Sequence, residues 1–288
     1  MKVVPKLVVL ALTAATITAM PTRLQAQASE IPSAQTAAQN GSQTNGVDQD
    51  KRGRILLDQM VAALGGDAWL NRRTAVFHGN TAAFFRGQPN LGSPPFWDFK
   101  QFADATHPEA DRIEYTKKRD IVQIYTAGNG YEITYKGNKP LPADQVKDYF
   151  LRQRHSLESI INVWLKQPGI VVLYEGASQV ERRQAEKVTL LGADNDAVTV
   201  ELDASSHLPL RRTFESRNVQ FKDHDEDVEQ YDDYHLIQGV MTPLTISRYK
   251  NGDLANQRFY LDVKYNEAIE PTMFNTDLPL KAKGKTKN

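Results

Sequence analysis

The heptapeptide AVTVELD, residues 197–203, opens the stretch that decides the fold, which continues to Asn266. Valine and leucine occupy its even positions, and threonine, glutamate and aspartate occupy odd ones, so its apolar side chains share one face of a strand. The same two-residue period returns in residues 240–246 and 259–265, and residues 250–253 between them read Lys-Asn-Gly-Asp, a tight-turn sequence. The stretch therefore predicts consecutive antiparallel hairpins in a sheet with one apolar and one polar face.

The N-terminus has the layout of a secretory signal peptide. Lys2 and Lys6 precede an apolar run, and the small residues Ala26 and Ala28 offer a cleavage site. The run is shorter than the ~20 apolar residues that a membrane-spanning helix needs. We therefore predict a signal peptide at residues 1–28, cleavage after Ala28, no transmembrane segment after cleavage, and a periplasmic or secreted location.

Composition suggests how the rest of the chain is organised. Residues 29–50 are rich in Ser, Gln, Asn, Ala and Gly and predict a disordered leader, and residues 281–288 predict a basic flexible tail. Residues 51–280, roughly 230 in number, suit a single sheet-rich domain. Because the chain has no cysteine, we expect no disulfides. Its 35 basic residues balance its 35 acidic residues, so we do not expect nucleic acid as a partner. We expect a monomer.

Two helical regions interrupt the strand pattern. Apolar residues at three- and four-residue spacing predict a helix over residues 51–64, which Gly65-Gly66 ends, and Asp67 can cap the short turn that follows. Residues 142–165 predict a helical insertion that His155-Ser156 breaks into two helices, with Ser156 capping the second.

The remaining segments predict the fold class. They contain eleven or twelve strands, and helices in a chain of this kind cover the apolar face of a curved sheet. The expected fold is α+β and β-dominated: an antiparallel half-barrel of about eleven strands wrapped around covering helices.

Three sequence motifs carry a resemblance to a known family. They are MVAALGGDAWL at residues 60–70, LPLRR at residues 208–212 and YHLIQGVMTP at residues 234–243. With these motifs the chain resembles the LolA/LolB-like superfamily of periplasmic outer-membrane lipoprotein-sorting proteins, in its uncharacterised branch. The resemblance implies a half-barrel with an apolar cavity for acyl chains of lipids or lipoproteins. No arginine of this chain aligns with the arginine that locks the lid in that family.

Aromatic and apolar side chains beside loops and lids are the candidates for the cavity wall, because ligand cavities are lined mainly by such groups. The predicted ligand-binding residues are Phe84, Phe85, Phe96, Trp97, Phe99, Phe102, Tyr149, Phe150, Ile161 and Trp164. Such a cavity needs no catalytic group and no cofactor, so a non-enzymatic lipid or lipoprotein carrier is the first hypothesis.

Two other functional classes stay open. An envelope-sensing or protein-interaction module could use the same sheet as a docking platform for envelope proteins. A secreted hydrolase has less support, because the chain lacks a Gly-x-Ser-x-Gly motif and its adjacent His155 and Ser156 would point apart on a helix. The acidic segment Asp223 to Asp227 could bind a cation, but its spacing matches no calcium loop, and no His-Glu-x-x-His motif seats zinc. We therefore predict no metal site.

Overall fold

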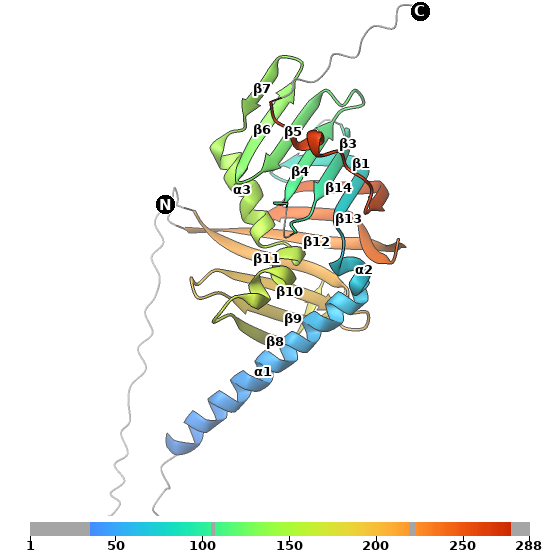
Figure 1. Ribbon diagram of the computed structural model, residues 1–288. Coiled ribbons are helices and arrows are strands. Elements are labelled where there is room, and N and C mark those ends of the chain that lie inside the picture. The colour runs from blue at the N-terminus through green and yellow to red at the C-terminus, as the bar shows by residue number, and fades with distance from the viewer. Residues whose placement is uncertain (1–34, 91, 105–106, 219–222, 278–288) are drawn as a thin grey trace, which may run out of the picture. The chain divides into compact units, whose positions relative to one another are not determined.

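The computed structural model describes residues 35–90, 92–104, 107–218 and 223–277. Of the two units into which the chain divides, the one that begins at Ser42 contains a single antiparallel sheet of fourteen strands (Figure 1). The strands are β1 (Thr74–Phe85), β2 (Gln88–Pro89), β3 (Pro95–Gln101), β4 (Ala110–Tyr115), β5 (Ile121–Thr126), β6 (Asn129–Thr134), β7 (Gly137–Pro140), β8 (Val171–Val180), β9 (Arg183–Leu191), β10 (Ala197–Asp203), β11 (Pro209–Asn218), β12 (Asp223–Ile237), β13 (Val240–Lys250) and β14 (Asp253–Tyr265).

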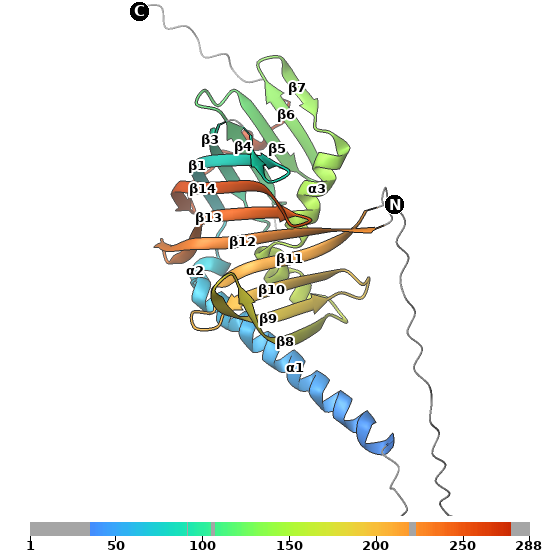
Figure 2. The ribbon, with the colours of Figure 1, turned by 180° about the vertical axis from the view of Figure 1, so that it is seen from behind.

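The strand order explains why helices cover one face of the sheet. The order is β7-β6-β5-β4-β3-β1-β14-β13-β12-β11-β10-β9-β8, with β2 paired to β1, so β7 and β8 are the two edges of an open sheet. These edges are consecutive in the chain, and the segment that joins them contains the helices α3 (Ala143–Arg154) and α4 (Leu157–Asn162). The helical insertion must therefore cross the sheet, and the view from behind shows α3 beyond the strands (Figure 2). This is the predicted β-dominated α+β half-barrel.

The strand count is higher than the predicted eleven or twelve. The strands β2 (Gln-Pro) and β7 (Gly-Asn-Lys-Pro) are too short to show the alternation that identifies a strand, and both contain proline, which is rare in strands. The acidic segment Asp223 to Asp227 lies within a strand, because β12 begins at Asp223 and pairs with β11 and β13. The predicted hairpin at Asn251-Gly252 is confirmed, since both residues have positive φ, as that turn type requires.

The first helix is longer than the sequence predicted. The helix α1 (Gln35–Leu64) begins well before residue 51 and includes residues predicted to be a disordered leader. Alanine and glutamine have high helix propensity, and extending a helix whose last turns are packed costs less than starting one. The predicted signal peptide, the first residues of the predicted leader and the predicted basic tail lie outside the described residues.

The helix boundaries inside the insertion agree with the prediction. The Ser156 hydroxyl accepts a hydrogen bond from the Ser159 amide at 3.1 Å and caps α4, and a short 3-10 turn, η1 (Trp164–Lys166), follows. Asp67 does not act as predicted. It is the first residue of α2 (Asp67–Leu70), and Gly66 occupies the capping position without a side-chain hydrogen bond. The Asp67 carboxylate still lies at the positive end of that helix, where its charge is favourable.

The C-terminal part of α1 packs against the sheet at the β8–β10 end. Leu57 and Met60 are fully buried in one apolar cluster with residues of β8, β9 and β10. Gly53 lets the helix approach closely, because a Cβ there would lie 2.7 Å from the Val172 side chain of β8. Among the described residues, no helix combines the length and apolar character that crossing a membrane would require.

Candidate functional site

A cavity of about 670 Å³ lies between the sheet and the helices α3 and α4. Its wall comes from β1, β3, β4 and β12–β14, from the two helices, and from the end of α1 with α2. The volume falls in the range of small-molecule binding sites, roughly 300–1,000 Å³. The cavity is therefore large enough to hold a ligand.

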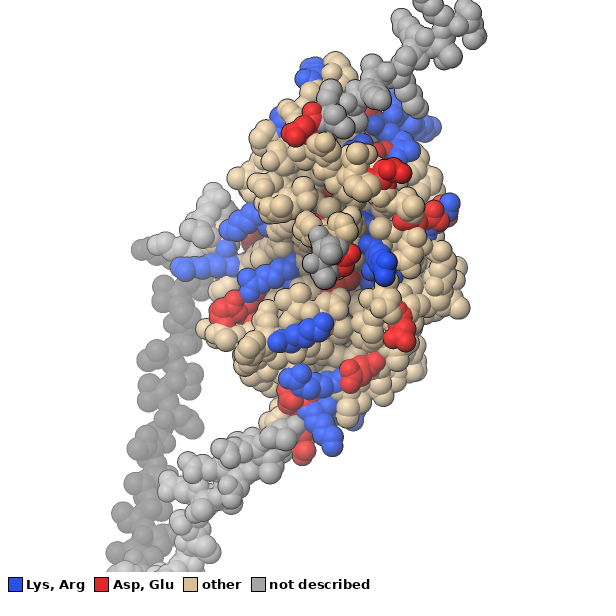
Figure 3. Space-filling view, viewed as in Figure 1, with Lys and Arg blue, Asp and Glu red and all other residues tan. Residues whose placement is uncertain are grey.

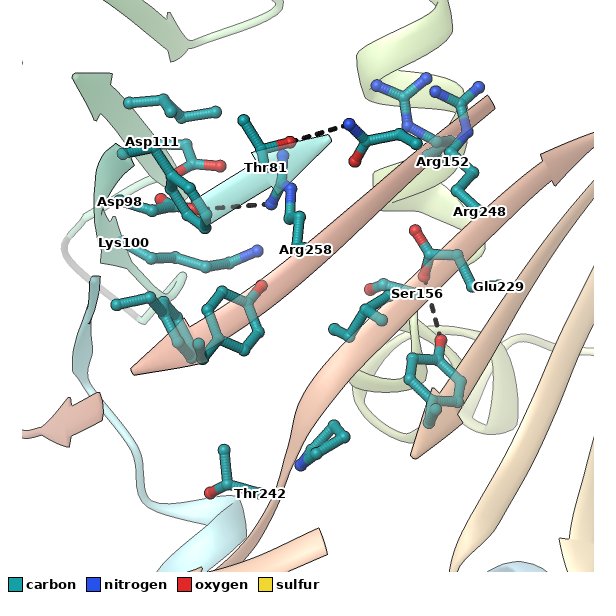
Figure 4. Close-up of a pocket in the computed structure, with 18 of the residues that line it drawn as sticks. Thr81, Asp98, Lys100, Asp111, Arg152, Ser156, Glu229, Thr242, Arg248 and Arg258 are labelled. Carbon is teal, nitrogen blue, oxygen red and sulfur yellow. Dashed lines mark hydrogen bonds and ion pairs between the residues drawn. The ribbon is translucent and has the colours of Figure 1, made fainter. Parts of the chain in front are cut away.

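The lining is amphipathic rather than uniformly apolar. Apolar and aromatic side chains line it together with charged residues that sequence alternation did not place there (Figure 4). The charged residues are Arg72, Asp98, Lys100, Asp111, Arg152, Glu158, Glu229, Arg248 and Arg258, and the tyrosines are Tyr115, Tyr149, Tyr231, Tyr234, Tyr260 and Tyr265. On the outer surface acidic and basic side chains are interspersed over the face seen in Figure 3, as expected for equal totals of the two signs.

Strand β3 shows why the prediction of an apolar wall was incomplete. Phe96, Asp98 and Lys100 line the cavity, and Phe102, which continues this alternation after the strand ends, lines it as well. The intervening Trp97 and Phe99 do not line it, and the Arg119 side chain covers their rings at 5.0 and 5.4 Å. Because aromatic residues occupy both faces of β3, aromatic content alone could not identify the inner face.

The ten predicted ligand-binding residues are not all brought together. Phe96, Phe102 and Tyr149 line the cavity, while Trp97 and Phe99 lie on the other face of the sheet. The remaining five are not among the lining residues. Phe84 and Phe85 pair with β2 at the end of β1, and Phe150 and Ile161 are half-buried against the core. Trp164 is fully buried and donates its ring N–H to the Arg154 carbonyl at 2.8 Å. Ligand contact stays a prediction for all ten.

Two buried carboxyl groups lie together on β3 and β4. The Oδ1 atoms of Asp98 and Asp111 are buried without a hydrogen-bond partner among the described residues. Burial, and then the neighbouring Asp111 carboxylate, raise the pKa of Asp98 well above its ordinary value. A protonated Asp98 can donate to Asp111, which gives both orphaned oxygens a partner.

Tyr149 connects this carboxyl pair to the covering helix. Its hydroxyl, on α3, donates to Asp111 Oδ2 at 2.7 Å, and its ring stacks on Tyr125 of β5 with the ring centroids 3.7 Å apart. Burial and the Asp111 charge raise the pKa of the Tyr149 hydroxyl well above its usual value, so the hydroxyl keeps its proton and acts as a donor.

A cluster of arginines lies where α3 meets β12 and β13. Arg248 binds Asp227 at 2.7 Å and Asp148 of α3 at 3.2 Å, and Arg152 of the same helix also pairs with Asp148. Figure 4 shows the Arg152 and Arg248 guanidinium groups side by side. Burial, and then the Arg248 charge, lower the pKa of Arg152.

Arg212 of β11 fixes the C-terminal end of α3. Its guanidinium is fully buried, lies 3.0 Å from a Glu229 carboxylate oxygen, and donates to the His155 carbonyl at 3.1 Å. The unpaired carbonyls at a helix C-terminus favour a cation. The insertion is thus held to the sheet by side chains of β4, β11 and β13.

The structure gives little support to hydrolytic or metal chemistry. The buried His155 has both ring nitrogens within hydrogen-bonding distance of acceptors, Leu151 O at 2.7 Å and Asp196 Oδ1 at 2.9 Å, and Ser156 uses its hydroxyl as a helix cap. No histidine is among the cavity-lining residues of the described chain. Within the described ranges, no three His, Cys, Asp or Glu side chains are grouped to hold a metal.

Comparisons with known proteins identify the architecture. No protein-family model matches the chain, and no curated protein matches its sequence. Among solved structures, the fold is similar to a DUF1329 family protein from Desulfovibrio piger, with a TM-score of 0.55 and 11% identity over 79% of this chain and 97% of that one. It is also similar to an outer membrane lipoprotein-sorting protein domain from Vibrio parahaemolyticus, with a TM-score of 0.52 and 9% identity over 78% of this chain and 97% of that one.

A LolA superfamily protein from Nitrosomonas europaea matches at a TM-score of 0.47 and 14% identity, over 78% of this chain and 98% of that one. Identities this low establish architecture and not activity. The fold that the resemblance implies is confirmed at that level: the protein shares the architecture of the DUF1329 family protein and of the lipoprotein-sorting protein domain.

Proposed function

We propose that this protein is an exported, non-enzymatic carrier or binding protein that holds an acyl chain of a lipid or lipoprotein in its cavity. The observation that carries the proposal is the cavity of about 670 Å³ between sheet and helices. An acyl chain gains about 0.8 kcal/mol for each methylene group that leaves water. The similarity to a lipoprotein-sorting domain supports the same class of ligand.

The apolar side of the cavity gives the chain a path. Along β13 the lining residues run from Arg248 through Ile246 to Val240, and Trp69 and Leu64 continue the wall beyond the strand. At about 3.3 Å per residue, the segment from Arg248 to Val240 is roughly 26 Å long. An extended acyl chain can lie along this wall.

Of the two covering helices, α3 has no buried side chain, whereas α4 buries Ile160 in the apolar cluster. Their ties to the sheet include hydrogen bonds and ion pairs from Tyr149, Asp148 and His155, groups that water can solvate once α3 moves. Helix movement is therefore the proposed route for entry and release.

Displacement of the neutral fluorophore N-phenyl-1-naphthylamine by fatty acid, together with mass spectrometry of co-purified lipid, tests the proposal. Ile246→Trp fills the cavity and should abolish both signals. Thr245→Trp is the matched control, because Thr245 is the neighbouring residue of the same strand and does not line the cavity. Absence of bound lipid and of displacement in the unmodified protein would refute a carrier role.

One observation favours a protein-interaction module as the second candidate. Phe259 and Leu261 of β14 are 38% and 66% exposed, two positions apart on a strand whose intervening Tyr260 points into the cavity. Exposed apolar groups of this kind can mark a docking surface. Partner binding by a docking module would be lost in Leu261→Ser and kept in Ile246→Trp. Lipid binding by a carrier would instead be lost in Ile246→Trp and kept in Leu261→Ser.

A further inference from the structure

We propose that the cavity selects amphiphiles with an anionic headgroup, a carboxylate or a phosphate, and that Arg152 and Arg248 bind this headgroup. The inference rests on the proposed function, because it names the chemical class of the ligand that the cavity holds. It follows from the placement of the two arginines, from their unused donors and from the carboxylate that they share.

Placement puts both guanidinium groups on the ligand space. Arg152 projects from α3 and Arg248 from β13, both line the cavity, and Figure 4 shows them adjacent. Two arginines on facing elements can donate hydrogen bonds to one anion from two sides. Guanidinium groups match carboxylate and phosphate geometry through parallel N–H donors.

Both side chains retain unused donors. Among the described residues, Arg152 forms its side-chain bond through Nη1 only, to Asp148. Arg248 uses Nε and Nη2, to Asp227 and Asp148, and leaves Nη1. Arg152 is only partly buried, with 21% of its side chain exposed, so its remaining N–H groups can reach a ligand.

The two arginines share one carboxylate of the covering helix. Arg152 and Arg248 both pair with Asp148, and Arg248 also pairs with Asp227. A single Asp148 charge cannot compensate both guanidinium groups, so an anionic headgroup would supply a second acceptor. Burial, and then the Arg248 charge, lower the pKa of Arg152.

The position of the cluster also sets the ligand's direction. Arg248 lies at one end of the β13 wall, and Val240 lies at the other with Trp69 and Leu64 near it. A headgroup on the arginines therefore directs the tail toward α1 and α2. A neutral headgroup would leave the unused N–H donors of both arginines without a charged acceptor in a partly desolvated site.

The test compares lauroyl compounds that share one tail. Lauroyl lysophosphatidic acid, sodium laurate and monolaurin compete with N-phenyl-1-naphthylamine on the full protein at low ionic strength. We expect both anionic compounds to displace the probe at concentrations at least tenfold lower than monolaurin. The preference should shrink as salt rises, because salt screens partly exposed charges.

Variants of single arginines test which side chain causes the preference for anionic headgroups. Arg152→Gln should remove the tenfold difference between the anionic compounds and monolaurin, whereas Arg152→Lys should keep part of it. Arg154→Gln is the matched control, two residues along the same helix, where the side chain pairs with Asp194 and Asp196. A retained preference in Arg152→Gln would overturn the assignment of this arginine. The comparison of headgroups on the unmodified protein remains decisive if that variant fails to fold.

The outcomes separate this inference from the proposed function. Equal displacement by all three lauroyl compounds would overturn anion selection and leave the carrier role standing. Displacement by none of them would refute the carrier role itself.

Inorganic phosphate and acetate, which have no acyl tail, are tested as competitors in the same assay. If inorganic phosphate alone displaces the probe at the same concentration as lysophosphatidic acid, the arginines bind a free anion and the lipid headgroup assignment is wrong.

Discussion

Asp98 is a buried carboxyl group that lines the cavity. Burial and Asp111 raise its pKa, so between the ordinary aspartate pKa and the raised value the unfolded chain has released a proton that the folded protein still holds. The folded state therefore loses stability as pH rises through this interval.

Asp98→Asn should remove this dependence. Urea unfolding at pH 5 and pH 8 should show that the variant gains stability relative to the unmodified protein at the higher pH. Asp262→Asn, on an exposed residue of β14, should follow the unmodified protein at both values. Parallel behaviour of Asp98→Asn and the unmodified protein would mean that Asp98 is ionised in the fold.

Arg212 is a second buried charged group, and it compensates the charges of neighbouring carboxylates. Arg212→Ala would leave the Asp227 and Glu229 carboxylates with less compensation, and removing one partner of a buried charge network costs about 3–5 kcal/mol. Denaturant unfolding measures the loss. Arg217→Ala, at an exposed position of the same strand, should change stability by less than about 0.5 kcal/mol. A similar small change in Arg212→Ala would contradict the proposed balance.

Sequence reasoning was least informative for single residues of the cavity. In β3 both faces contain aromatic side chains, so Phe96 and Trp97 looked equivalent although only the first lines the cavity. Arg152, Arg248 and Asp98 could not be predicted as lining residues, because their partners lie on distant strands or on the crossing helix. Such pairing is a property of the fold and leaves no local pattern.

The helix α3 shows how single contacts control an element. Tyr149→Phe removes the hydrogen bond to Asp111 and keeps the stacked ring on Tyr125. We expect a loss of about 1–2 kcal/mol and faster amide hydrogen exchange in residues 143–154. Tyr135→Phe, at a side chain 76% exposed, is the control and should alter neither. Unchanged exchange in Tyr149→Phe would show that this bond does not hold the helix.

The turn after α1 makes a second prediction for an element. Gly65 has φ 126°, and a Cβ there would overlap the Gly239 carbonyl oxygen at the start of β13. Gly65→Ala should therefore destabilise the protein by more than about 1 kcal/mol. Gly46→Ala is the contrasting variant, because its Cβ would meet open space within a helix and should stabilise by roughly 0.5–1 kcal/mol. Thermal unfolding that ranks the two variants in the opposite order would contradict this account of the turn.

Elements were predicted better than residues, because their signals are local. Ser156 and the Gly65-Gly66 pair mark helix boundaries that the structure confirms, and Asn251-Gly252 marks a hairpin. The start of α1 was wrong because a polar sequence carries no apolar period, although its alanines and glutamines permit a helix. Short β2 and β7 were missed because two to four residues cannot show alternation.

At the scale of the molecule, topology creates the cavity. The first strand pairs with the last, β1 with β14, so the sheet's edges are the consecutive strands β7 and β8. The helical insertion that joins these edges has to cross the sheet, and the space beneath it is the cavity. The alternating pattern predicted the sheet and the insertion, but not this strand order, because pairing across most of the chain has no sequence signature.

The central claim is that an acyl chain lies in this cavity, and photo-crosslinking with a diazirine-labelled fatty acid tests it most directly. Tyr260 and Leu261 are neighbours in β14, but Tyr260 lines the cavity whereas Leu261 is exposed. Peptide mass spectrometry should find adducts on Tyr260, Ile246 and Tyr231, and unlabelled fatty acid should suppress them. Adducts confined to Leu261 and Phe259 would place the ligand on the outer face and contradict the account.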